Sequence, residues 1–152
     1  MGTPKKMLRK DEVKKIASCF NTRQIATKWG LSSYQRRKMN EAFRNGAGPA
    51  FTDESLNLQT SKNLEKDLNN WIQLFKHNKW GENNAMERPI FNMQALCDEC
   101  ELDYTRYRYL IATVNGKAVY LLSGDDREKL AAKLEVMIAV ARTVLMGEVS
   151  KE

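Results

Sequence analysis

The chain has little of what secreted and membrane proteins depend on. Its 152 residues include only three cysteines, and an odd number of cysteines is not typical of a disulfide framework. This indicates a reducing compartment, and we expect a cytoplasmic protein. No apolar run approaches the roughly 18 residues that a membrane span needs, and no signal-peptide core follows the basic N-terminus. We therefore expect no membrane partner.

Catalytic and metal-binding patterns are also scarce. With one histidine, no glycine-rich phosphate loop and no convincing carboxylate pair, the sequence does not indicate an enzyme. Cys97 and Cys100 form a Cys-x-x-Cys pair that Cys19 and His77 could complete as a zinc set. The second closely spaced ligand pair of a zinc site is missing, and free cysteine behaves as a small buried hydrophobe. We expect no metal, no cofactor and no small-molecule ligand.

Negative charge is nearly absent from the first third of the chain. Residues 1–46 contain 12 Lys and Arg against 3 Asp and Glu, a balance of +9, whereas the remaining 106 residues contain 13 against 16, a balance of −3. The whole positive excess therefore lies in the first third. Such asymmetry favours a polyanionic partner, most commonly nucleic acid, and the alternative is a solvated basic tail.

Three short helices are predicted in this basic third. An apolar stripe along residues 11–20, spaced i, i+3, i+4 and i+7, predicts the first. A second is expected to begin at Asn21 or Thr22 and to end at Gly30, because glycine adopts the left-handed conformation at low cost. A third is expected to begin at Ser32 or Ser33, which are favourable N-caps.

Residues 22–39, TRQIATKWGLSSYQRRKM, resemble the helix-turn-helix motif of DNA-binding regulators of bacteria, phages and plasmids. Ala26 stands where the motif has a small residue at the contact of its two helices, Gly30 at the turn, and Leu31 at the apolar position after it. The resemblance implies that the second helix of the motif enters the major groove of DNA. A buried helical hairpin with a solvated basic face is the alternative.

One residue departs from the pattern of that family. Arg36 stands where most members have a branched apolar residue, so either the recognition helix is rotated or Tyr34 does that packing. Arginine can pair with guanine, and asparagine or glutamine with adenine. The expected contacts in this helix are Ser33, Gln35, Arg36, Arg37, Lys38, Asn40 and Arg44. Cations elsewhere are expected to contact phosphates, and they are Lys5, Lys6, Arg9, Lys10 and Lys28.

A weaker echo of the motif follows at residues 93–110, MQALCDECELDYTRYRYL, at an offset of 71 from the first. Glu101 replaces the turn glycine, and the acidic residues around it would repel phosphate. We expect this second unit to serve packing or partner contacts. The alternative is a second DNA contact through Tyr104, Arg106 and Arg108.

The C-terminal region is predicted to hold a hairpin and a long helix. Asn115-Gly116 lies between apolar segments and favours a two-residue hairpin turn that would make the second unit winged, although Gly116 could equally end a helix. An amphipathic helix is expected from about Ser123 to Met146. Its stripe is interpreted as a seam between the subunits of a homodimer, the alternative being the core of one chain. The stripe consists of Leu130, Leu134, Met137, Ala141 and Val144.

These patterns together predict a mainly α protein with tandem helix-turn-helix units. The expected divisions are a basic arm and first motif at 1–46, a linker and a packing helix from about Ser61 at 47–91, and a second motif with an oligomerisation helix at 92–152. The expected function is sequence-specific binding of double-stranded DNA by a small transcriptional regulator. The alternatives are a DNA-packaging, replication or partition accessory and a non-enzymatic protein-interaction adaptor.

Overall fold

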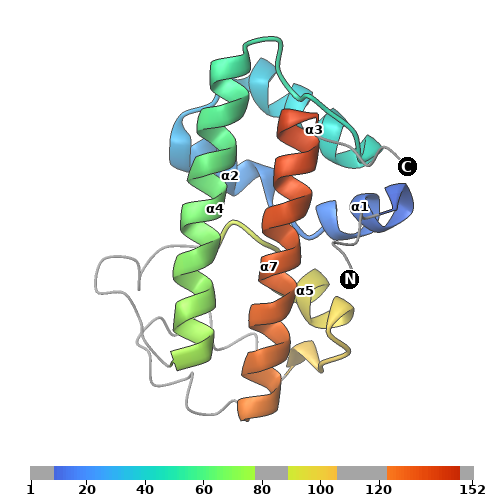
Figure 1. Ribbon diagram of the computed structural model, residues 1–152, viewed down its shortest axis with the longest axis vertical. Helices are drawn as coiled ribbons and strands as arrows, with labels where there is room; N and C mark the ends of the chain where they lie inside the picture. The colour runs from blue at the N-terminus through green and yellow to red at the C-terminus, as the bar shows by residue number, and fades with distance from the viewer. Residues whose placement is uncertain (1–8, 78–88, 106–122, 148–152) are drawn as a thin grey trace, which may run out of the picture.

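In the computed structural model of the protein, residues 9–77, 89–105 and 123–147 are described (Figure 1). The chain within these ranges is mainly helical, which confirms the expected mainly α class. Its helices are α1 (Lys10–Ala17), α2 (Thr22–Trp29), α3 (Ser33–Asn45), α4 (Glu54–His77), α5 (Met93–Glu99) and α7 (Gly124–Met146). No helix in the described ranges has both the length and the apolar character to cross a membrane. The hairpin turn expected at Asn115-Gly116 lies outside the described residues.

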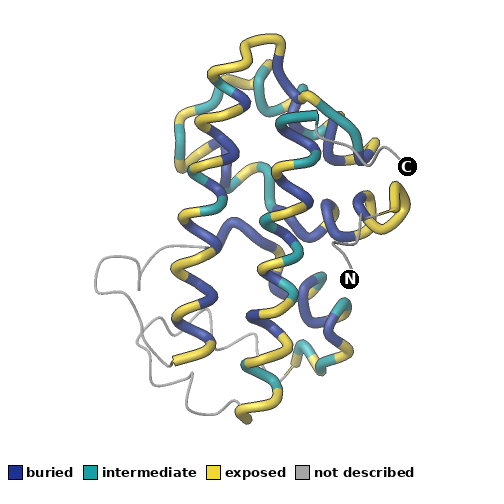
Figure 2. The backbone as a smooth tube through the Cα atoms, in the orientation of Figure 1, coloured by how far each residue is buried: buried dark blue, intermediate teal, exposed yellow. Residues whose placement is uncertain are grey.

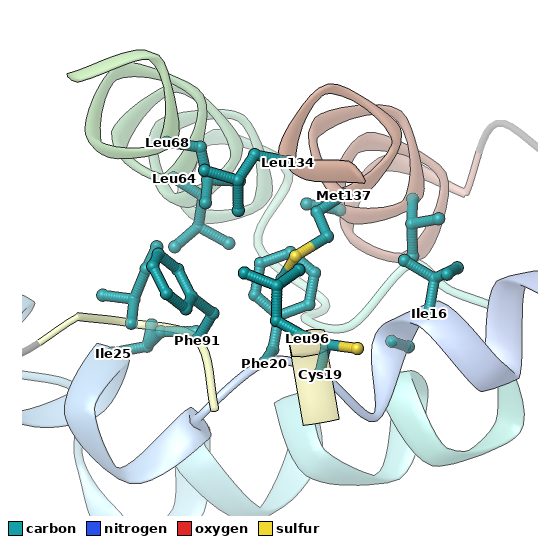
Figure 3. Packing of buried hydrophobic residues seen from close by; sticks show 14 of the residues in the cluster. Ile16, Cys19, Phe20, Ile25, Leu64, Leu68, Phe91, Leu96, Leu134 and Met137 are labelled. Carbon is teal, nitrogen blue, oxygen red and sulfur yellow. The ribbon is translucent and has the colours of Figure 1, made fainter. Parts of the chain in front are cut away.

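Two long antiparallel helices, α4 and α7, form the centre of the fold. In Figure 1, α4 runs from top to bottom and α7 from bottom to top, with the three N-terminal helices toward the upper half and α5 below them. The buried sides of α4 and α7 face one another (Figure 2). Leu64 and Leu68 of α4 and Leu134 of α7 are fully buried in this contact (Figure 3). Burying one such side chain stabilises the fold by about 1.5–3 kcal/mol.

The interpretation of the α7 stripe as a subunit seam is wrong. All five of its residues are buried within the single chain, with exposed fractions of 0–2%. The same spacing that suits a coiled coil also suits a helix whose apolar side lies in its own core, and α4 supplies that core. These five residues are Leu130, Leu134, Met137, Ala141 and Val144.

The packing helix begins earlier than expected. α4 starts at Glu54 rather than near Ser61, so part of the expected linker is helical. Asp53 caps it: its carboxylate accepts hydrogen bonds from the Ser55 hydroxyl at 2.8 Å and the Ser55 N–H at 2.9 Å. These bonds, with one from the backbone of Leu56, hold the pKa of the Asp53 carboxyl below its ordinary value.

The buried positions in the first turns of α4 are polar, and this explains why apolar periodicity missed them. Asn57, Thr60 and Ser61 have exposed fractions of 2–7%. The amide of Asn57 accepts from the N–H of Phe51 at 2.9 Å and donates to its carbonyl at 2.8 Å. A buried polar side chain that is hydrogen-bonded in this way need not destabilise the core.

The N-terminal helices pack on one side of this pair. Ile16 of α1, Ile25 of α2 and Met39 of α3 all lie in the common core. The segment after α3 passes so close to the end of α7 that a Cβ at Gly48 would lie 1.6 Å from the carbonyl oxygen of Val144. Only glycine fits this approach, and the approach holds α3 against the long helices.

Candidate nucleic-acid interface

The local geometry of α2, the following turn and α3 follows from its capping residues. Asn21 caps α2 by accepting a hydrogen bond from the N–H of Gln24 at 3.2 Å. Gly30 ends the helix at φ 66°, and the N–H of Leu31 returns to the carbonyl of Ala26 at 2.9 Å. Ser32 then caps α3. The three boundaries expected from the sequence are thereby confirmed.

One side of α3 is buried and the opposite side is open. Met39, Ala42 and Phe43 face the core with exposed fractions of 0–7%. The residues on the outer side are Ser33, Tyr34, Arg37, Glu41 and Arg44, all of them exposed. Three of the expected DNA-contacting residues, Ser33, Arg37 and Arg44, thus share an open face.

An aromatic ring lies among the cations of this face. Tyr34 is 60% exposed, so of the two alternatives for Arg36 the inward packing of Tyr34 is wrong. The Arg37 guanidinium lies 5.4 Å and the Lys38 ammonium 6.0 Å from its ring centre, within the range of cation–π attraction. Lys38 also lies 3.4 Å from the Glu41 carboxylate, the one anion on the open face. Tyr34 therefore holds two cations at the start of α3.

Three other residues of α3 are partly withdrawn from the surface. The Gln35 side chain accepts from the N–H of Ser32 at 2.8 Å, which completes a capping box. Asn40 accepts a hydrogen bond at 2.7 Å from the hydroxyl of Thr22, at the start of α2. Arg36 is half-buried, and its Nε is buried without a hydrogen-bond partner among the described residues. Gln35 and Asn40 therefore position α3, and all three side chains are less available to DNA than the sequence suggested.

Lys28, expected to contact phosphate, instead connects α2 to α4. Its ammonium lies 3.2 Å from the carboxylate of Asp67, whose side chain is only 7% exposed. It also lies 5.5 Å from the centre of the Trp29 ring. Removing one partner of such a pair would leave a buried charge uncompensated, so Lys28 is engaged within the fold rather than open to phosphate.

The cations of α1 border the same region. Arg9 and Lys10, at the start of α1, are exposed, whereas Lys5 and Lys6 lie outside the described residues. A cavity of about 450 Å³ lies between α1 and α3. Its lining residues are Lys14, Lys15, Ala17, Ser18, Phe20, Thr22, Asn40, Phe43 and Arg44.

Lys14 and Lys15 were counted in the charge balance but not assigned to the site. Their positions in the first predicted helix, on the side opposite its apolar stripe, could have identified them from the sequence. Lys15 is partly compensated, because its ammonium lies 3.9 Å from the Glu99 carboxylate. Lys14 and Arg44 extend the open face of α3 toward α1 as one basic surface, which we call the α1–α3 basic surface: Lys14, Arg37, Lys38 and Arg44.

The second motif has the opposite charge. Asp98, Glu101 and Asp103 are exposed around the turn after α5, and Tyr104 is half-buried. Arg106 and Arg108 lie outside the described residues. Acidic side chains at this turn oppose the approach of phosphate.

The three cysteines are buried and not bonded to one another. Burial raises the pKa of the Cys19 and Cys97 thiols to about 12 and that of Cys100 to about 11. Such thiols stay protonated at neutral pH and are poor nucleophiles. Among the described residues, no three His, Cys, Asp or Glu side chains are arranged to hold a metal ion. His77 is exposed at the end of α4.

Comparison of the chain with protein-family models, with curated proteins and with solved structures finds no match.

Proposed function

We propose that this protein binds double-stranded DNA in a sequence-specific manner through α3, as a small transcriptional regulator of bacterial, phage or plasmid origin. The observation that carries the proposal is the α1–α3 basic surface. Its cations are grouped around the open face of a helix that follows a tight turn, the arrangement by which a helix-turn-helix presents its second helix to the major groove.

The positions of these cations indicate which of them contact bases and which contact phosphates. Arg37 lies in the first turns of α3, where a helix entering the groove meets base edges, and its fork of donors suits guanine. Arg44 and Lys14 lie near the other end of α3 and at the end of α1. Cations at the periphery of a groove-bound helix contact phosphates and fix its register without reading sequence.

Selection from random duplex DNA tests this proposal. Wild-type protein should enrich a defined motif. Arg37→Ala should weaken binding to that motif by about 1–3 kcal/mol and relax one position of it. Lys76→Ala removes a charge near the far end of α4 and serves as the control, with binding unchanged apart from a small electrostatic effect.

Other results would favour the alternatives. Duplex binding without an enriched motif would indicate a packaging, replication or partition accessory that assembles on DNA. Absence of duplex binding at low salt would refute the proposal and leave the protein-interaction adaptor. Equal binding by Arg37→Ala and wild type would show that α3 is not the reading helix.

A further inference from the structure

Two segments far apart in the sequence make the same local hydrogen bonds. The N–H of Gln24 donates to the side chain of Asn21 at 3.2 Å, and the N–H of Ala95 donates to that of Asn92 at 3.1 Å. Both asparagines are N-caps, of α2 and α5. Each member of the first pair is 71 positions before its counterpart in the second (21 to 92, 24 to 95).

The turns that follow these helices also repeat. The N–H of Leu31 donates to the carbonyl of Ala26 at 2.9 Å, and 71 positions later the N–H of Leu102 donates to that of Cys97 at 2.8 Å. Gly30 has φ 66°, and its counterpart Glu101 has φ 59°. A glutamate seldom adopts this conformation, so the turn is imposed on Glu101 by the structure around it.

The two segments meet each other through a reciprocal pair of hydrogen bonds. The N–H of Asn21 donates to the carbonyl of Ile90 at 2.7 Å, and the N–H of Asn92 donates to that of Cys19 at 2.7 Å. Between them, Phe20 and Phe91 form an isolated antiparallel bridge. If each residue is exchanged for its counterpart 71 positions away, Asn21 for Asn92 and Ile90 for Cys19, each bond becomes the other. A local two-fold axis produces this pattern.

The buried positions of the long helices also repeat, at an offset one residue smaller than that of the turns. α4 and α7 are antiparallel and have 24 and 23 residues. At an offset of 70 (60 to 130), seven buried positions of one helix match seven of the other. The pairs are Thr60 and Leu130, Ser61 and Ala131, Leu64 and Leu134, Asp67 and Met137, Trp71 and Ala141, Leu74 and Val144, and Phe75 and Leu145.

The repeat extends to the backbone and the core, but the charges of the two units differ. Lys28 at the end of α2 pairs with Asp67 of α4 at 3.2 Å, whereas its counterpart Glu99 at the end of α5 lies 4.0 Å from Lys133 of α7. Around the turns, Thr27, Gly30 and Ser32 have the counterparts Asp98, Glu101 and Asp103. Only the first unit therefore presents a surface suited to phosphate.

We infer that the chain is a single-chain pseudo-dimer that binds DNA as a monomer, through its first unit, at one half-site without inverted symmetry. A two-fold helix-turn-helix dimer reads two symmetric half-sites because its subunits present identical helices. Here the place of the second subunit is taken by the second half of the same chain, and that half is acidic. The inference rests on the proposed function and specifies its target and stoichiometry.

The test combines mass, selected sequence and a pair of matched variants. Light scattering after gel filtration should give the mass of one chain for the free protein and of one chain per duplex for the complex. The selected motif should lack an inverted repeat. Arg37→Ala should weaken binding about tenfold or more, whereas Arg108→Ala, its counterpart at the offset of 71 (37 to 108), should change it less than about twofold.

Each contrary result has a distinct meaning. Two chains on a palindromic motif, or equal losses from Arg37→Ala and Arg108→Ala, would overturn the inference while the DNA-binding function stands. No duplex binding by the wild-type protein would overturn the function and, with it, the inference. A free protein with the mass of two chains would overturn the pseudo-dimer whatever the DNA result.

Discussion

Arg36 and Arg37 are neighbours in the sequence but lie in different surroundings. Arg37 is exposed beside the ring of Tyr34, whereas the Nε of Arg36 is buried without a hydrogen-bond partner among the described residues. A buried polar group without a partner destabilises a fold by about 1–3 kcal/mol. We therefore expect Arg37 to contribute to binding and Arg36 to lower the stability of the fold.

Replacing Arg36 by leucine tests this difference. Arg36→Leu supplies the branched apolar residue that the helix-turn-helix pattern has at this position, and we expect it to raise the free energy of unfolding by about 1 kcal/mol in urea. Arg37→Leu is the matched control and should leave stability unchanged within about 0.5 kcal/mol. A loss of stability in Arg36→Leu would show that its guanidinium contributes to packing.

The two turns offer a second comparison between residues in one conformation. Gly30 and Glu101 both have positive φ, and a Cβ at Gly30 would meet no atom within 4 Å. Gly30→Ala should therefore destabilise by about 1 kcal/mol through backbone strain alone, and Glu101→Gly should stabilise by a similar amount. Thermal unfolding followed by circular dichroism measures both. Shifts of the same sign in the two variants would contradict the equivalence of the turns.

At the scale of elements, the ion pair of Lys28 and Asp67 connects α2 to α4. The side chain of Lys28 is 27% exposed and that of its partner Asp67 is 7% exposed. Lys28→Met keeps the apolar stem but removes the charge, and we expect it to lower the free energy of unfolding by about 1–3 kcal/mol. Urea titration gives the value.

The exposed pair of Lys38 and Glu41 provides the control for this prediction. Its side chains are 40% and 54% exposed, and such pairs contribute about 0.5 kcal/mol or less. Lys38→Met should thus alter stability little while weakening DNA binding. The opposite ranking, with Lys28→Met harmless to stability and harmful to binding, would restore Lys28 to the DNA interface.

At the scale of the whole molecule, α4 and α7 are the common support of both units. Leu134 and Met137 of α7 are fully buried. Glutamate at both positions would bring two carboxylates into an apolar core, and removing a leucine side chain alone costs about 2–5 kcal/mol. We expect Leu134→Glu with Met137→Glu to lose most of its helicity at 25 °C, as measured by circular dichroism.

A double variant at exposed positions of α7 serves as the control for that experiment. Glu135 and Ala139 of α7 are exposed, and Glu135→Gln with Ala139→Glu should keep full helicity. A folded, monomeric Leu134→Glu, Met137→Glu protein formed from a dimeric wild type would mean that the stripe faces another chain after all.

The sequence by itself determined the local features of this protein. The caps at Asn21, Gly30 and Ser32 could be predicted because helix ends depend on residues within one turn of them. The basic character of the first third and the repeat at an offset of 71 were likewise visible in the residues alone. Backbone hydrogen bonds repeat at that offset, even at Glu101, where the residue type argued against it.

Only the tertiary structure decided what each apolar or charged side of a helix packs against. The α7 stripe suits a subunit seam and a core equally, because periodicity defines an apolar side but not its partner. The burial of Asn57, the pairing of Lys28 with Asp67 and the half-burial of Arg36 all depend on residues distant in the sequence. Such contacts exist only once the chain has folded, and they separate the cations that hold helices together from those left open for a partner.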